Sequence, residues 1–389
     1  MPWKETCPVK ERGQFVRDLA SGQWTMTELC EHHGVSRPTG YKWARRYEER
    51  GDEGLAELSR APRTCPHRTA DGVEEQVVLL KKTHGWGARK IHRLLRKEVA
   101  PSELPCRSTV FDILKRHGLV RSRRRRQRWQ HPGAAALHTK APNEVWTIDF
   151  KGQFKTRDGV YCYPLTVLDN FSRYLLACTA LHDVKTRGTK RALERLFRDV
   201  GLPDAIRSDN GPPFASTGIH GLCELNVWWM KLGIIHQRIQ PSSPQENGAH
   251  ERMHRTLKAK VTRPPAQNLR GQQWKFDRFR DEYNADRPHE SLDDEVPASL
   301  WIPSLRPFPP RLQAPEYPNH FELRRVSNAG HFKLGAQHHF ISHALRGDYL
   351  GLEEIDDAIW SLVYYKTLLG RLDLRTGKIT GATFRSAEC

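Results

Sequence analysis

The segment Val145-Trp-Thr-Ile-Asp-Phe-Lys151 places a single carboxylate, Asp149, inside an otherwise largely apolar run. Its aromatic and β-branched residues favour a β-strand, where an aspartate is unfavourable unless a partner needs it. The segments that follow alternate between strand and helix patterns, which predicts a mixed sheet with helices on its faces. Asp149 therefore marks this sheet as the first place to expect a functional site.

The elements expected around Asp149 follow from hydrophobic periodicity and turn signals. Besides residues 145–151, strands are expected over residues 161–168, 173–180, 205–208 and 234–239. Helices are expected over residues 189–200, 221–232, 246–260 and 274–284.

Two further carboxylates follow where these elements end or begin. Asp209 ends a strand in Ile206-Arg-Ser-Asp-Asn-Gly211, and Glu251 lies near the start of a helix. If the strands of Asp149 and Asp209 are neighbours and the helix crosses their ends, the three carboxylates converge. They would repel one another unless a divalent cation neutralised them. The set suits two Mg²⁺ ions, one activating a nucleophilic oxygen and one stabilising the leaving oxygen of a phosphodiester.

Each carboxylate taken singly has a simpler explanation. Asp209-Asn-Gly is a common turn sequence, and Glu251 suits the first turn of a helix because of the helix dipole. The simpler explanation is weakest for Asp149, because an aspartate in the middle of a strand needs a partner. Asp169, another carboxylate near the sheet, fits a hairpin turn between two strands.

The charge of the chain is concentrated ahead of this sheet. Residues 1–140 hold 29 Lys and Arg against 16 Asp and Glu, whereas residues 141–389 hold 34 against 29. The front third thus supplies +13 of the net charge of +18. Such clustering favours a nucleic-acid-binding region joined to a second function over a merely solubilising surface.

The first 50 residues predict three short helices. The second is expected near residues 27–32 with Thr27 as its cap, and the third starts at Ser36 after a turn at Gly34. Helix, turn and basic helix form a helix-turn-helix unit, whose second helix enters the major groove of DNA. An ordinary three-helix bundle with a basic surface is the alternative. The residues expected to contact DNA are Arg37, Thr39, Lys42, Arg45 and Arg46.

A second set of three helices is expected over residues 73–82 and 89–98 and from a cap at Ser108 to His117. A run of six arginines follows it. Contact with the DNA backbone is more plausible for these residues than a solvated linker, given the neighbouring helical units. The expected contacts are Lys115, Arg116, Arg121, Arg123, Arg124, Arg125, Arg126 and Arg128.

Three segments resemble a known family: Trp146-Thr-Ile-Asp149, Ser208-Asp-Asn-Gly-Pro-Pro-Phe214, and Gln240-Pro-Ser-Ser-Pro-Gln-Glu-Asn-Gly-Ala-His-Glu-Arg252. The chain resembles the DDE transposases of bacterial insertion sequences, which share a catalytic core with retroviral integrases. The resemblance implies an RNase H-like core in which Asp149, Asp209 and Glu251 are catalytic and hold metal. It also implies DNA cleavage and strand transfer with two Mg²⁺ ions, for which Mn²⁺ can substitute.

One spacing departs from the family pattern. Forty-one residues separate Asp209 from Glu251, about six more than usual, and we assign the excess to an insertion near residues 215–220. Glu246 lies closer to the usual spacing and is kept as the alternative to Glu251. The order Pro-Gln-x-x-Gly-x-x-Glu favours Glu251.

The helix that follows Glu251 carries further candidate residues. By resemblance Arg255 and Lys258, on the same helix face as Glu251, are expected to contact DNA; ordinary helix-surface charge is the alternative. His250 and His254 are expected to be bystanders, because Mg²⁺ prefers oxygen ligands.

The fold class expected is therefore a multi-domain α+β chain. It comprises two helix-turn-helix units, an RNase H-like α/β core with a mixed sheet, and a small β-barrel-like C-terminal domain with strands over residues 320–326, 331–334, 338–341, 350–355, 359–365 and 368–374. We expect the following boundaries: first helix-turn-helix domain 1–50, linker 51–68, second 69–120, Arg-rich linker 121–141, core 142–300, Pro-rich linker 301–318, and C-terminal domain 319–389.

The expected function is that of a DNA transposase. It would bind the terminal repeats of an insertion sequence as a homodimer or larger assembly on double-stranded DNA. The alternatives are a catalytically silent repressor derived from a transposase, and an RNase H-type nuclease acting on RNA–DNA hybrids.

The location expected is the bacterial cytoplasm, in association with the nucleoid. The chain shows no membrane span and no secretory signal. Its eight cysteines are scattered with no Cys-x-x-Cys pair, which argues against a disulfide framework or a Cys-rich zinc module.

Overall fold

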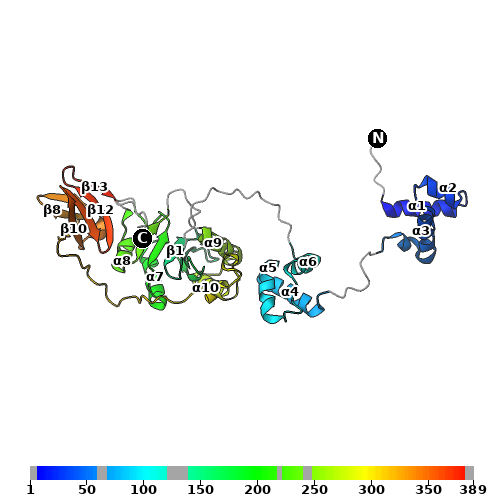
Figure 1. Ribbon diagram of the computed structural model, residues 1–389, viewed down its shortest axis with the longest axis horizontal. Helices are drawn as coiled ribbons and strands as arrows, with labels where there is room; N and C mark the ends of the chain where they lie inside the picture. Colours follow the sequence, from blue (N-terminus) through cyan, green and yellow to red (C-terminus); the bar gives the residue numbers. More distant parts are fainter. Residues whose placement is uncertain (1–6, 59–67, 121–138, 217–220, 240–247, 382–389) are drawn as a thin grey trace. The chain divides into compact units, whose positions relative to one another are not determined.

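The computed structural model describes residues 7–58, 68–120, 139–216, 221–239 and 248–381. The chain divides into two compact units, Met1–Ala70 and Asp71–Cys389, whose elements are labelled in Figure 1. The run from Arg121 to Arg128, Glu246, and most of the expected insertion near residues 215–220 lie outside the described residues.

The first unit contains the three expected helices. They are α1 (Pro8–Ala20), α2 (Met26–His32) and α3 (Arg37–Arg50), followed by the 3₁₀ turn η1 (Gly51–Leu55). Phe15, Val16, Leu29, Trp43 and Leu55 form their buried core. This is the arrangement of helices expected for a helix-turn-helix unit.

The predicted cap of α2 was wrong by two residues. Thr25, not Thr27, is the N-cap: its hydroxyl accepts from the Glu28 backbone N–H, and the Glu28 carboxylate accepts from the Thr25 N–H at 2.9 Å. The reason is local, because a Thr followed three residues later by a Glu closes a reciprocal capping box.

The second unit begins with another set of three helices, α4 (Asp71–His84), α5 (Ala88–Glu98) and α6 (Arg107–Arg116). Val77, Trp86, Ile91, Leu95 and Ile113 belong to its buried core. The predicted cap at Ser108 was wrong, since α6 begins after Cys106, whose Sγ lies 3.0 Å from the Ser108 hydroxyl and 3.1 Å from that of Thr109.

A six-stranded mixed sheet forms the centre of the second unit, as expected. Its strands are β1 (Val145–Phe150), β2 (Phe154–Lys155), β3 (Tyr161–Asp169), β4 (Leu175–Leu181), β5 (Ala205–Ser208) and β6 (Ile235–Arg238). The order is β2-β3-β1-β5-β6, and β4 also pairs with β3. The β1–β3 and β3–β4 pairs are antiparallel, whereas β1–β5 and β5–β6 are parallel.

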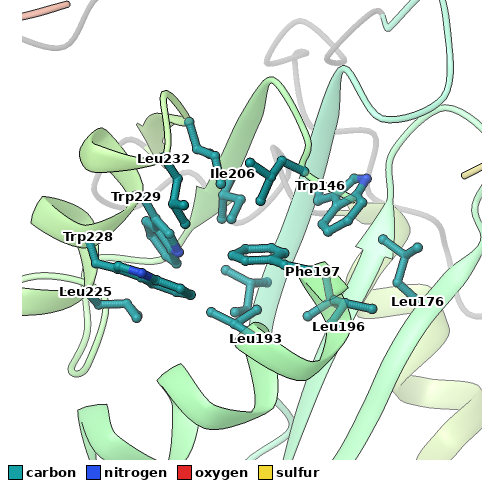
Figure 2. Packing of buried hydrophobic residues seen from close by; sticks show 14 of the residues in the cluster. Trp146, Leu176, Leu193, Leu196, Phe197, Ile206, Leu225, Trp228, Trp229 and Leu232 are labelled. Atoms are coloured by element: carbon teal, nitrogen blue, oxygen red, sulfur yellow. The ribbon is translucent and has the colours of Figure 1, made fainter. Parts of the chain in front are cut away.

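Helices α7 (Thr186–Val200) and α8 (Glu224–Lys231) cover one face of this sheet. Figure 2 shows the layer between the sheet and these helices, in which Phe197 of α7 lies between Trp146 of β1 and the two tryptophans of α8. The rings of Phe197 and Trp228 stack with centroids 5.4 Å apart. This dry aromatic layer holds β1 and β5 in place beneath the helices.

Helices α9 (Gly248–Val261) and α10 (Leu269–Ala285) cover the opposite face. Met253 and Leu257 of α9 and Phe276 of α10 pack with Leu168 of β3 and Cys178 of β4 in a second buried cluster. The sheet is thus sandwiched between two helix pairs, and α9 lies on the face opposite α7 and α8.

The C-terminal region is an open antiparallel sheet, so the predicted barrel does not close among the described residues. The strands β7 (Glu322–Arg325), β10 (Tyr349–Asp356), β11 (Ile359–Tyr364), β12 (Thr367–Asp373) and β13 (Lys378–Gly381) pair in the order β13-β12-β11-β10-β7. The strands β8 (His331–Leu334) and β9 (Gln337–Phe340) form a separate hairpin.

The physical reason for the open sheet lies at its edges. A barrel needs every strand to have two partners, yet β7 and β13 have four residues each, largely half-exposed or exposed, and do not pair with each other. The face of α8 that carries Val227 and Met230 packs into the core of this C-terminal sheet.

Two further findings concern membrane-spanning helices and the state of the cysteines. Across the described ranges, no helix combines the length and apolar character needed to cross a membrane. The six cysteines that the structure describes are free thiols.

Candidate active site

Strand alternation places Asp149 on the face of the sheet that α9 covers. Trp146 and Ile148 of β1 belong to the aromatic layer beneath α7 and α8. Because successive strand side chains point to opposite faces, Thr147 and Asp149 lie on the other side. Hydrogen bonds from Thr147 to a side chain of α9 confirm this orientation.

Parallel pairing brings Asp209 to the same edge of the sheet. In the register of β1 and β5, Val145 is opposite Ala205 and Thr147 is opposite Arg207. Asp209 directly follows β5, so the continuation of this register leads to Asp149 and Asp209 side by side. Its Oδ1 accepts a 3.3 Å hydrogen bond from the Gly211 N–H, which turns the chain at this point.

The charges of the other two carboxylates act on Asp149. Burial raises the pKa of Asp149 to about 7, with the charge of Asp209 as the next largest cause and the charge of Glu251 as a further one. Desolvation also raises the pKa of Asp209. Neighbouring negative charges disfavour each other's ionisation, and this effect is what a divalent cation would relieve.

Glu251 lies in the first turn of α9 with an exposed side chain. The structure therefore brings Asp149, Asp209 and Glu251 into electrostatic contact from a strand, a strand end and a helix.

A buried network of two histidines and two threonines fixes α9 against the sheet. The Thr147 hydroxyl lies 2.8 Å from His250 Nδ1, and the Thr166 hydroxyl lies 2.7 Å from the Nε2 atoms of both His250 and His254. All four residues are at most 4% exposed. Since Glu251 lies between the two histidines, the network sets the position of its helix.

The two threonine hydroxyls also contact backbone carbonyls. The Thr166 hydroxyl lies 2.9 Å from the carbonyl oxygen of Asp149, and the Thr147 hydroxyl lies 3.3 Å from that of Leu168. Each hydroxyl has one proton to donate among these groups, and the donor at each ring nitrogen depends on the tautomer. Burial lowers the pKa of His250 to about 3 and that of His254 to about 2, so both rings are neutral.

A second possible metal-binding group overlaps this network. One ligand atom from each of Asp149, His250 and His254 lies within 4.8 Å of the others. Both ring nitrogens of His250, however, are already engaged by threonines. His254 Nδ1 lies 3.6 Å from Asp149 Oδ2, too far for a hydrogen bond. The carboxylates of Asp149, Asp209 and Glu251 are the better donor set for a hard cation.

Asp169 has the structural role expected for it. It is fully buried at the end of β3, where its carboxylate accepts hydrogen bonds from the backbone N–H groups of Asn143 and Ser172 and from the Ser172 hydroxyl, at 2.8, 2.8 and 2.6 Å. These bonds fasten the turn between β3 and β4, which confirms the hairpin interpretation.

The residues expected to contact DNA occupy helix surfaces. In α3, Arg37, Lys42 and Arg45 are exposed, whereas Thr39 and Arg46 are half-buried. The Arg46 guanidinium lies 5.0 Å from the centre of the Trp43 ring, and Arg45 pairs with Glu49 at 2.9 Å.

The remaining candidates divide between α6 and α9. Lys115 and Arg116 are exposed on α6, where Arg116 pairs with Glu74 at 3.1 Å. Arg255 and Lys258 are exposed on α9, one and two turns after Glu251.

Thr166→Val is expected to destabilise the attachment of α9 by about 2–4 kcal/mol, because it removes the hydroxyl that hydrogen-bonds both buried histidines. Hydrogen–deuterium exchange of α9 peptides should report this as faster exchange. Thr179→Val on β4, a half-buried threonine, is the matched control. Equal exchange in both variants would contradict the role of the network.

Comparison with known families now identifies the class of protein. A family model described as integrase core domain matches residues 139–244, and a second with the same description matches residues 232–297. Models described as homeodomain-like match residues 8–56 and 39–114. The chain thus contains a segment similar to the integrase core domain, preceded by segments similar to homeodomain-like domains.

Similar proteins confirm the resemblance to insertion-sequence transposases. The chain is 28% identical over 227 residues to an uncharacterized 31.7 kDa protein of the insertion element IS407 from Burkholderia multivorans, covering 58% of this chain and 78% of that protein. It is 30% identical over 199 residues to an uncharacterized 39.2 kDa protein of IS476 from Xanthomonas euvesicatoria, covering 50% of this chain and 54% of that one.

A viral relative and a solved structure extend the comparison. The Gag-Pol polyprotein of avian reticuloendotheliosis virus is 35% identical over 142 residues, which are 34% of this chain and 12% of the polyprotein. The HTLV-2 integrase catalytic core in complex with magnesium aligns at 18% identity with 43% of this chain and 99% of that one. Its TM-score is 0.34, too low to establish a common fold by itself.

Proposed function

We propose that the chain is a DNA transposase. It binds the terminal repeats of an insertion sequence, hydrolyses the phosphodiester at the element ends, and joins the freed 3′-hydroxyl to target DNA. The observation that carries this proposal is the raised pKa of Asp149, which arises in part from the charges of Asp209 and Glu251. Three interacting carboxylates at one sheet edge of an integrase core support phosphodiester chemistry.

Asp149, Asp209 and Glu251 are the proposed catalytic residues and the proposed ligands of two Mg²⁺ ions. The donor set fits this group, because all three ligands are hard oxygens and Asp149 is destabilised as an anion when no cation is near. Divalent ions held there would activate the attacking oxygen and stabilise the leaving oxygen of the phosphodiester.

The protein's own side chains contribute by holding the carboxylates and the DNA in position. The network of Thr147, Thr166, His250 and His254 holds the helix of Glu251 against the strand of Asp149. Arg255 and Lys258, exposed on the same helix, are proposed to hold the DNA beside the carboxylates. No side chain needs to form a covalent bond to DNA, since water and then the 3′-hydroxyl are the nucleophiles.

Recognition of the element ends is assigned to the helical units, with α3 in the major groove. Replacing Lys42 or Arg45 by Ala is expected to weaken binding to the preferred sequence by about 1–3 kcal/mol if the side chain reads a base edge. Footprinting and titration on that sequence measure the effect, with Lys10→Ala on α1 as an exposed control. An unchanged footprint after loss of both would move recognition to the set α4–α6.

Two DNA ends must meet before strand transfer, so we propose a homodimer or larger assembly on double-stranded DNA. Sedimentation with and without a DNA duplex measures this assembly. A stable monomer on paired ends would contradict it.

The experiment that tests the proposed function uses duplexes selected from a random library by binding to the purified chain. With Mg²⁺, cleavage and joining to a second duplex are expected, and both should stop on chelation. Binding without cleavage would favour the silent repressor. Faster cleavage of RNA–DNA hybrids than of duplex DNA would favour an RNase H-type nuclease.

A further inference from the structure

Besides the candidate active site, the structure has a strongly basic cavity of about 380 Å³ beside the first turn of α9. We call it the basic pocket. Its cations come from distant parts of the sequence: Arg173 from the turn before β4, Arg252 from α9, Arg287 from the segment after α10, and Lys90 from α5. Its remaining lining residues are Gly248, Ala249, Thr256, Tyr283, His289, Glu290 and Ser291.

These four cations lack a carboxylate partner. Within the described residues, no Asp or Glu oxygen forms an ion pair with Arg173, Arg252, Arg287 or Lys90. Glu290 also lines the basic pocket, but its carboxylate pairs with Arg89 at 2.7 Å. Asp294 pairs with the same arginine at 2.8 Å. Both of these carboxylates are therefore already engaged by α5.

Burial makes this arrangement electrostatically unfavourable. Burial lowers the pKa of Arg173, and the charge of Arg252 lowers it further. Burial is also the cause of the lowered pKa of Arg287. Burial and then the charge of Arg287 lower the pKa of Lys90 to about 7. Arg173, Arg287 and Lys90 are half-buried, whereas Arg252 is exposed. The charges of Asp169 on Arg173, Glu282 on Arg287 and Asp294 on Lys90 oppose these pKa shifts without reversing them, so a bound anion would stabilise the group of cations.

We propose that the basic pocket binds a phosphate of the DNA backbone, next to the catalytic carboxylates. This assignment rests on the proposed function and adds a binding site to it. Arg252 directly follows Glu251 on α9, so a phosphate held by it lies within one helical turn of the proposed centre. The pocket would thus fix the position of the DNA strand relative to that centre.

The chemistry of the lining suits a phosphate ligand. Three guanidinium groups offer planar pairs of donors that match phosphate oxygens bidentately, and an ammonium group adds a point charge. The Thr256 hydroxyl accepts from the Arg287 guanidinium at 3.4 Å, which aligns that side chain along α9.

The test couples single DNA phosphates to single arginines. A duplex selected by binding to the wild-type chain is synthesised with one neutral methylphosphonate at each position in turn, and Kd is measured for the full chain and for Arg173→Gln and Arg287→Gln. At one position the methylphosphonate should weaken wild-type binding by about 10-fold. The same change should have little effect on either variant. Arg191→Gln, an exposed arginine of α7, should keep the wild-type pattern.

A second measurement separates DNA phosphate from free phosphate and checks folding. Thermal unfolding of each variant is compared in sodium phosphate and in sodium chloride of equal ionic strength. Variants that unfold at the wild-type temperature in chloride but bind DNA more weakly support the assignment. Stabilisation by inorganic phosphate without any coupled DNA position would overturn it, because the pocket would then hold a free anion.

The remaining outcomes are also decisive. If the arginine substitutions and the methylphosphonates change Kd additively at every position, the proposal is overturned. The proposed function would still stand, because this result leaves DNA cleavage intact. Absence of DNA binding by the wild-type chain would contradict both.

Discussion

Asp149→Asn is expected to lower the rates of DNA cleavage and strand transfer by at least about 10³-fold while DNA binding stays near the wild-type level. Asn keeps the size of the side chain but removes the negative charge that holds a divalent cation. Because burial and the charges of Asp209 and Glu251 already disfavour ionised Asp149, the variant should be at least as stable as wild type without metal. Rates are measured with end-labelled duplex in Mg²⁺.

Asp199→Asn on α7 is the matched control, since it removes an exposed carboxylate far from the three candidates in sequence. It should cleave at the wild-type rate. Equal cleavage by wild type and Asp149→Asn would end the enzyme interpretation and leave a DNA-binding protein.

Glu251→Gln is expected to produce a loss of similar size, whereas Glu246→Gln should leave cleavage nearly unchanged. The two residues are the alternatives left by the long spacing after Asp209. The charge of Glu251 acts on Asp149, and the histidine network fixes its helix. The measurement is the same cleavage assay, with DNA binding as the check on folding.

The opposite result, a large loss in Glu246→Gln and full activity in Glu251→Gln, would transfer the third carboxylate role to Glu246. It would leave the roles of Asp149 and Asp209 untouched. Loss of DNA binding in Glu251→Gln would instead indicate damage to α9.

Local patterns in the sequence were sufficient to predict the mixed sheet and most of its elements. The strand over residues 205–208 was predicted at its observed bounds, because an apolar run ended by Asp-Asn-Gly leaves little freedom. Helix ends were less predictable. The start of α2 differs from prediction because a side-chain capping box, not periodicity, decides where that helix begins, whereas α6 begins after Cys106 without a side-chain cap.

The short strands β2 and β13 were missed. Each has so few residues that pairing with a longer neighbour, rather than its own sequence, makes it a strand. The barrel was predicted from the number of strands alone. Closure, however, depends on whether the edge strands find each other, and β7 and β13 do not.

The site was predicted in part because its carboxylates stand out locally. Asp149 is conspicuous inside a strand, and the parallel register of β1 and β5 places Asp209 beside it. The histidines were treated as bystanders to the metal, which agrees with their hydrogen bonds to Thr147 and Thr166. Their spacing of four residues on one helix face was the only available signal of this network.

No local feature of the sequence indicated that these cations form one pocket. Arg173, Arg252 and Arg287 lie in three separate segments of the sequence. Only the folding of the β3–β4 turn, α9 and the segment after α10 brings them to one cavity. Long-range convergence of this kind depends on tertiary packing, which periodicity does not encode.

The central claim is that Asp149, Asp209 and Glu251 form one site for divalent cations. The most direct test is anomalous diffraction from crystals of the wild-type chain grown with Mn²⁺. We predict peaks within about 2.2 Å of carboxylate oxygens of Asp149 and Asp209, with Glu251 completing the site, and none in Asp149→Asn. Peaks on the ring nitrogens of His250 and His254 without Asp209, or no ion at the three carboxylates, would contradict it.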